Sequence, residues 1–260
     1  MFGTILKKTF WNTFDHLGTL ILLNLVWFFV SVPWFVGGFF ALRVLAGALG
    51  VAGVITGFAA WILAVWLNPA SLWILSVASE WAEYRTLSRS ELWGLLRSRL
   101  FTGLWLSVVA SLTALILGAN AAFYLSLSGK LHWIGLFLAG ITIWVLVALV
   151  SLGYHLGLLL SRDRSADVRE GLRQALYFSL TTPFASLLLG VATLVFAALL
   201  VMTQVGLPLA AMAFPAVFAA TGERELFKRL LPKDERDPAA DRAEEARTFR
   251  DLIKPWDMDR

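Results

Sequence analysis

The sequence predicts an all-α protein, a polytopic transmembrane helical bundle of about six spans arranged in three hairpins. Of its 260 residues, 58% are hydrophobic, and the mean hydropathy is +0.73. No Asp, Glu, Lys, Arg or His occurs between Arg43 and Glu80. Because about 18 consecutive apolar residues are enough to cross a bilayer, we expect lipid rather than water to solvate most of the chain.

The cysteine and charge content exclude several classes of function. The absence of Cys removes disulfides, thiolate metal sites and cysteine nucleophiles. The isoelectric point of about 9.6 would suggest a nucleic-acid partner for a soluble protein. In a membrane protein the same excess of Lys and Arg is typical of cytoplasmic connections, so we expect no nucleic-acid partner.

Residues 1–16 are expected to form a cytoplasmic amphipathic arm that lies at the membrane interface. Lys7, Lys8, Asn12 and Asp15 lie mostly off its apolar face. The following run is too long for the apolar region of a signal peptide and is expected to be a retained span. The apolar face of the arm comprises Ile5, Leu6, Thr9, Phe10, Thr13 and Phe14.

The transmembrane helical domain is expected to cover residues 17–221. Its first hairpin is expected to consist of residues 17–40 and 44–67, joined near Arg43, with a kink or an end at Pro33. Small residues make one face of the second helix nearly smooth, which lets another helix approach closely. These residues are Gly47, Gly50, Gly53 and Gly57.

The pair Asn68-Pro69 divides the long uncharged run. Asn favours the N-cap position and Pro favours the first helical turn, so we expect one helix to end near Leu67 and another to start at Pro69. Residues 69–79 are too short to cross the hydrocarbon core alone. They either complete the return crossing as an offset half-helix or re-enter and lie along the inner face.

Four further spans are expected in the rest of the domain, at residues 100–127, 133–160, 175–203 and 209–221, the last bent at Pro215. Of the 22 Lys and Arg residues, only Arg43 and Lys130 then fall outside the cell. The positive-inside rule therefore places both termini in the cytoplasm. A charged amphipathic arm precedes each hairpin, at residues 6–17, 91–103 and 168–180.

Residues 222–260 are expected to form a charged cytoplasmic tail. Residues 223–231 are expected to extend the last helix into water, and Asp237-Pro238 to start a second short helix. An apolar stripe on that second helix either docks on the cytoplasmic face or a partner, or belongs to a mostly disordered tail. The stripe consists of Phe249, Leu252, Ile253 and Trp256.

No catalytic, cofactor or metal motif occurs in the sequence, so we expect a protein that is not an enzyme. His16 and His132 fall at opposite membrane edges and are not placed to share a metal with His155. Hydrogen bonding between helices is favoured over substrate contact for the asparagines, and a structural hydrogen bond is favoured for His155. The candidate polar positions within the membrane are Asn24, Asn68, Asn120, Tyr154 and His155.

Four segments together carry a resemblance to a known family: residues 24–27 with Pro33, residues 69–72, the basic arm at 92–101, and residues 172–183. They are similar to the YesL-like family of uncharacterised bacterial membrane proteins. The resemblance covers most of residues 10–231, whereas residues 38–67 are an insertion and residues 237–260 lie outside it. It implies a location in the bacterial plasma membrane and an accessory role beside carbohydrate-uptake systems of the ABC type.

Two functional hypotheses follow from these features. The first is a non-enzymatic accessory or scaffold subunit whose arms and tail contact a membrane-protein partner or a second copy of the chain. The alternative is a small-solute transporter or channel with a path near Asn24, Asn120 and His155. A water-accessible cavity in the middle of the bundle would favour the transporter, and a dry, packed centre would favour the scaffold.

Overall fold

The structure, a computed structural model, describes residues 2–83, 85, 87–162, 167–203 and 206–230. Within these ranges all regular structure is helical, which confirms the predicted all-α class. Four helices, α2, α4, α5 and α7, are long and apolar enough to cross a membrane. The helices are α1 (Phe2–Asp15), α2 (Leu17–Trp66), α3 (Pro69–Ala82), α4 (Arg89–Leu125), η1 (Gly129–Leu131), α5 (His132–Arg162), α6 (Val168–Thr181), α7 (Pro183–Met202), α8 (Gly206–Ala210) and α9 (Ala213–Leu230).

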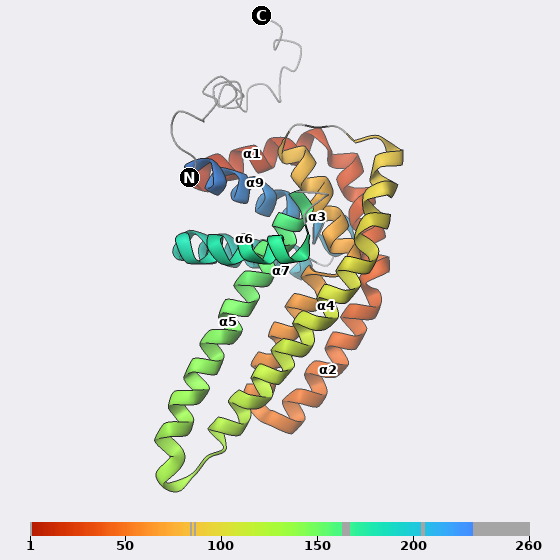
Figure 1. The fold of residues 1–260 in the computed structure, drawn as a ribbon. Helices are drawn as coiled ribbons and strands as arrows, with labels where there is room; N and C mark the ends of the chain where they lie inside the picture. The colour runs from red at the N-terminus through yellow and green to blue at the C-terminus, as the bar shows by residue number, and fades with distance from the viewer. Residues whose placement is uncertain (1, 84, 86, 163–166, 204–205, 231–260) are drawn as a thin grey trace, which may run out of the picture.

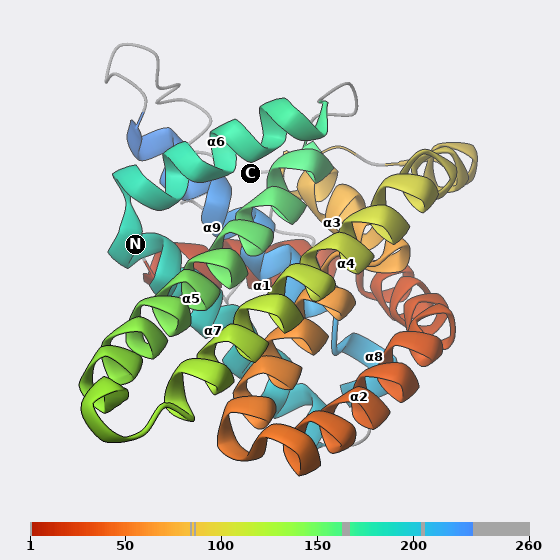
Figure 2. The ribbon, with the colours of Figure 1, turned by 60° about the horizontal axis from the view of Figure 1, so that its bottom comes forward.

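The bundle has two dissimilar ends. Helices α2, α4 and α5 run side by side, and α1, α3 and α9 gather at the end away from the α4–α5 turn (Figure 1). The bend of α2 and the η1 turn lie together at the far end, which Figure 2 brings forward. Arg43 and Lys130 therefore belong to segments near one end, whereas Lys7 and Lys8 on α1 and Arg89 on α4 belong to the other.

Helix α2 is a hairpin that reverses at Gly50. This residue has φ 57° and ψ −134°, a conformation that residues other than glycine rarely adopt. The chain then returns antiparallel, since a Cβ built on Gly53 would meet the Leu45 carbonyl and one on Gly57 would meet Leu42. The turn was expected near Arg43 and lies seven residues further along the chain, at Gly50. Pro33 lies inside the first leg and does not end it.

The predicted close approach along the glycine face is confirmed at two of its four positions. A Cβ on Gly53 would lie only 1.9 Å from the Leu45 oxygen, and one on Gly57 only 2.9 Å from Leu42 Cδ1. A Cβ on Gly47 would meet nothing within 4 Å. The partner of this face is the first leg of the same helix, so the glycines serve to close the hairpin.

Helix α3 begins where the sequence predicted. Asn68 is its N-cap and accepts a hydrogen bond from the Ser71 amide at 2.8 Å, and Pro69 occupies the first turn. Every residue from 69 to 78 is buried, against α4, α5 and α9. The segment is therefore a core helix enclosed by protein, which explains why it is apolar on all sides.

Helix α9 is the second helix of the core. The sixth helical segment was expected from Leu209 with a bend at Pro215; instead α8 and α9 meet near Met212, and Pro215 lies in the first turn of α9, where proline is tolerated. Residues from Glu223 onward were expected to extend into water. That expectation is wrong for Glu223 and Leu226, which are buried against the bundle.

Two of the three expected arms are separate helices, α1 and α6, whereas residues 91–103 continue directly into the span as part of α4. Both separate arms bury one narrow face against the bundle. The buried sets are Ile5, Thr9, Trp11 and Asn12 on α1 and Gly171, Ala175 and Phe178 on α6. The predicted apolar face of α1 is therefore rotated: Asn12 faces the bundle, while Leu6, Phe10 and Phe14 are exposed on the outside.

Candidate functional site

Asn24 serves as a helix cap supplied from a distant part of the chain. It is fully buried on α2, and its Oδ1 accepts hydrogen bonds from the amides of Met212 at 2.8 Å and Ala213 at 3.0 Å. These amides belong to the start of α9, where the first N–H groups lack partners within the helix. The Asn24 side chain therefore fixes α9 to α2.

Asn68 belongs to a buried hydrogen-bonded cluster that joins the first leg of α2 to α3. Its Nδ2 donates to Ser31 Oγ at 3.1 Å, and Trp27 Nε1 donates to Ser71 Oγ at 2.8 Å. Ser71 Oγ in turn donates to the Val65 carbonyl at 2.5 Å. Each of these polar groups makes a hydrogen bond between α2 and the start of α3. Hydrogen bonding between helices is the role that the sequence analysis favoured for Asn24 and Asn68.

Asn120 does not join the other candidate positions. It lies exposed near the end of α4, whereas Asn24 and His155 are fully buried. Asn24 contacts Met212, just before the start of α9, and His155 contacts Glu223 in the middle of that helix. At 1.5 Å rise per residue the two contacts are separated by roughly 16 Å along the helix axis, so the structure does not bring Asn24, Asn120 and His155 onto one path.

His155 and Glu223 form a buried ionisable pair between α5 and α9. The His155 Nδ1 and the Glu223 Oε1 are 3.6 Å apart, and the two residues are 0% and 5% exposed. This distance is too long for a hydrogen bond. Within the described part of the chain, neither ring nitrogen nor this carboxylate oxygen has a hydrogen-bond partner. The structural hydrogen bond expected for His155 is thus replaced by a close contact with a carboxyl group.

Sequence reasoning did not single out Glu223. The sequence feature that could have predicted its burial is helical spacing. Glu223 shares one face of α9 with Ala216, Ala219 and Leu226, and all four residues are buried. Burial raises the pKa of the Glu223 carboxyl, while the nearby His155 and Arg162 lower it in part. The residue lies beyond position 221, where the transmembrane domain was expected to end.

The pair adjoins a charged network, which we call the charged end of the bundle. Arg162 Nε lies 3.7 Å from Glu83 Oε1, and the Arg162 guanidinium lies 4.5 Å above the Phe227 ring. Arg224 donates to the Ala82 carbonyl. The charged end consists of Lys8, Glu83, Arg99, Arg162, Glu223, Arg224 and Glu225. A cavity of only about 20 Å³ lies within it, large enough for one water molecule.

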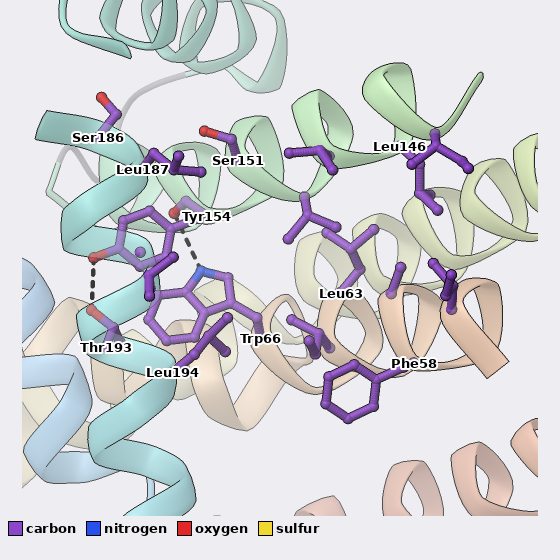
Figure 3. Close-up of a pocket in the computed structure, with 18 of the residues that line it drawn as sticks. Phe58, Leu63, Trp66, Leu146, Ser151, Tyr154, Ser186, Leu187, Thr193 and Leu194 are labelled. Carbon is purple, nitrogen blue, oxygen red and sulfur yellow. Dashed lines mark hydrogen bonds between the residues drawn. The ribbon is translucent and has the colours of Figure 1, made fainter. Parts of the chain in front are cut away.

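Tyr154 lies at one end of a larger cavity, which we call the α7 pocket (Figure 3). This pocket has a volume of about 390 Å³ and lies between the second leg of α2, α5 and α7. Tyr154 Oη pairs with Thr193 Oγ1 at 3.0 Å, and Trp66 Nε1 donates to the Tyr154 carbonyl at 3.2 Å. A second apolar cavity, of about 480 Å³, lies between α2 and α7 and shares Phe58, Trp66 and Leu194 with the first.

The described side chains do not form a metal site, because they contain no group of three or more His, Asp or Glu placed to hold an ion. The predicted tail stripe, Phe249, Leu252, Ile253 and Trp256, lies outside the described residues. Comparison of the chain with known protein families, curated proteins and solved structures gave no match.

Proposed function

We propose that the chain is a non-enzymatic accessory or scaffold subunit of the bacterial plasma membrane. The observation that carries the proposal is the use of the buried asparagines. Asn24 caps α9 and Asn68 caps α3, so these two buried asparagines hold helices together and neither lines one of the described cavities. At the end of the bundle that holds α3, residues 69–78 are all buried against α4, α5 and α9, and packing of this kind favours a scaffold over a solute path.

The partner surface in this proposal is the exposed part of α4 and α6 next to the charged end. Arg89 and Arg97 on α4, and Arg169 and Arg173 on α6, are exposed. Exposed basic residues steer association with an acidic partner surface. The association with a carbohydrate-uptake system rests on the YesL-like resemblance alone.

The partner is tested by affinity purification from native membranes in a mild detergent. We expect a second protein at a fixed ratio, and we expect Arg169→Gln with Arg173→Gln to reduce its yield. Arg43→Gln, also exposed but on α2, is the matched control. Purification of the chain alone in every case would count against the scaffold. A second pull-down with residues 238–260 deleted tests whether the predicted tail stripe takes part.

The proposal includes six crossings with both termini in the cytoplasm. In this proposal the crossings are made, in order, by the two legs of α2, by α4, α5 and α7, and by the segment from α8 to Thr221 in α9. The chain has no Cys, so a single introduced Cys reports on one position. We expect an impermeant maleimide to label Ser128→Cys on intact cells, and Ser90→Cys only after the membrane is permeabilised. Labelling of both positions from the same side would contradict this topology.

The alternative, a small-solute transporter or channel, is favoured by one observation. His155 and Glu223 are buried ionisable groups, and both His155 ring nitrogens and the Glu223 Oε1 lack a hydrogen-bond partner in the described chain. Such groups often mark ion or substrate pathways. The test is His155→Cys in the cysteine-free chain. Rapid modification by a small charged methanethiosulfonate reagent would indicate a water-filled path and favour the transporter, whereas protection from the reagent supports the scaffold.

A further inference from the structure

The α7 pocket is a cavity of about 390 Å³ that the scaffold proposal does not use. Its base is formed by buried side chains from three helices: Leu63 and Trp66 on α2, Tyr154 on α5 and Thr193 on α7. Its outer rim is formed by residues that are exposed, among them Phe58 and Val191, at 53% and 49%. The pocket is therefore a deep recess in the side of the bundle that opens outward between α2, α5 and α7.

Water is a poor occupant for this recess. The lining is dominated by Val, Ile, Leu and Phe side chains, and cavities of that kind stay dry because they offer a water molecule too few hydrogen-bond partners. An empty recess of this size is also unfavourable, since the side chains around it lose their dispersion contacts. The three lining helices are all long and apolar enough to cross a membrane, so the hydrocarbon of the bilayer lies next to the opening.

The recess has one polar end. The hydroxyl groups of Ser151, Tyr154 and Ser186 lie toward one side of it, and Phe58 and Leu146 lie toward the other (Figure 3). Tyr154 adjoins His155, which contacts Glu223 in the charged end. The apolar end of the recess is therefore directed toward the Gly50 bend, away from the charged end.

This polarity matches that of a lipid chain in the leaflet next to the charged end. We propose that the α7 pocket binds one acyl chain of a membrane phospholipid. The chain lies along α7 with its ester group beside Ser151 and Tyr154 and its terminal methyl toward Phe58. The hydroxyl of Ser151 donates to an ester carbonyl, and the apolar lining replaces the contacts that the chain has with other lipids. This inference does not depend on the identity of a protein partner.

Gly190 gives the inference a direct test. It lines the pocket on α7, and a Cβ at this position would meet only the Tyr154 ring, at 4.0 Å. A larger side chain there enters the recess without striking the backbone. Gly140 on α5 is the matched control, because a Cβ there meets nothing within 4 Å and the residue does not line the pocket.

The experiment is native mass spectrometry of the full chain in a non-ionic detergent, with dioleoylphosphatidylcholine added in steps. We expect the unmodified chain and Gly140→Phe to hold one phospholipid tightly, and Gly190→Phe to bind it about tenfold more weakly. We also expect the phospholipid to raise the thermal unfolding midpoint of the first two proteins and not that of Gly190→Phe.

Equal binding by Gly190→Phe and the unmodified chain would overturn the assignment, and so would the absence of tight binding to the unmodified chain. If Gly190→Phe does not fold, Val147→Phe obstructs the same recess from α5, because Val147 lines it and is exposed. The same two outcomes then apply to that variant.

Discussion

His155 on α5 and Glu223 on α9 face each other inside the bundle, with Nδ1 and Oε1 3.6 Å apart. These positions are 68 residues apart in the sequence, and the contact forms only because α9 packs beside α5 with Glu223 turned inward. A carboxylate buried in this way lacks the water that would stabilise its charge. The protonation state of Glu223 is therefore linked to the stability of the packed α9.

The first prediction concerns pH. Burial raises the pKa of Glu223 in the folded protein, with His155 and Arg162 opposing this only in part. A carboxyl group whose pKa is raised by folding contributes stability that is fully present below its unfolded pKa, about 4.3, and that is lost as the pH rises through its folded pKa. We therefore expect the thermal unfolding midpoint of the unmodified chain to decrease, relative to that of Glu223→Gln, as the pH is raised from about 5 to about 8.

The comparison is made by thermal unfolding in detergent across this pH range. Glu170→Gln on α6 is the control, since the Glu170 side chain is 52% exposed and interacts at the surface with Arg173. We expect this control to follow the pH dependence of the unmodified chain. Parallel curves for Glu223→Gln and the unmodified chain would show that the buried carboxyl does not govern the slope.

The second prediction concerns the cap on α9. Replacing Asn24 with Leu removes the acceptor for the amides of Met212 and Ala213 and leaves both N–H groups buried. An unsatisfied buried donor costs about 1–3 kcal/mol, so we expect Asn24→Leu to destabilise the protein by at least about 2 kcal/mol. Asn120→Leu, at an exposed position on α4, should change the stability by less than about 0.5 kcal/mol. Equal effects in thermal unfolding would contradict the capping role.

The third prediction concerns the packing of α1 on α9. Glu225 Oε1 lies 2.7 Å from Lys8 Nζ on α1 and 3.8 Å from Lys228 Nζ on its own helix. The Lys8 side chain is 9% exposed and that of Lys228 is 25% exposed. A double-mutant cycle with Glu225→Ala should give a coupling of about 1–2 kcal/mol for Lys8→Ala and less than about 0.5 kcal/mol for Lys228→Ala. A larger coupling for Lys228 would mean that α1 is not held by this ion pair.

The parts of the fold that depend on local chemistry could be predicted from the sequence. Asn68 and Pro69 carry a start signal that acts within one turn, and α3 begins there. The apolar runs likewise predict the long helices, because their length alone matches a bilayer.

The parts that depend on tertiary contacts could not be predicted in the same way. Gly47, Gly50 and Gly53 are equally able to reverse the chain, and packing selects Gly50. The sequence predicts that Glu223 is exposed to water, because it starts a run of charged residues. Its burial instead results from the packing of α9 against α5, where it contacts His155. The α7 pocket has no sequence signature, since apolar residues that line a recess and those that face lipid are of the same kind.

The last prediction concerns closure of the α2 hairpin. A methyl group on Gly53 would lie 1.9 Å from the Leu45 carbonyl oxygen, and this backbone atom cannot move aside unless the two legs separate. Overpacking of this kind typically costs about 1–3 kcal/mol. We expect Gly53→Ala to lower the unfolding midpoint and to weaken the contact of the first leg with Trp61, which packs beside Gly38.

Gly47→Ala provides the matched comparison on the other side of the bend. Its Cβ meets nothing within 4 Å, and alanine favours a helix over glycine by up to about 1 kcal/mol. We therefore expect this variant to be neutral or slightly stabilised. Two glycines six positions apart in the same uncharged run should thus respond to one methyl group with opposite signs. If both substitutions destabilise the protein equally, the loss reflects a general demand for small residues in this run, and the antiparallel approach of Gly53 to Leu45 is not its cause.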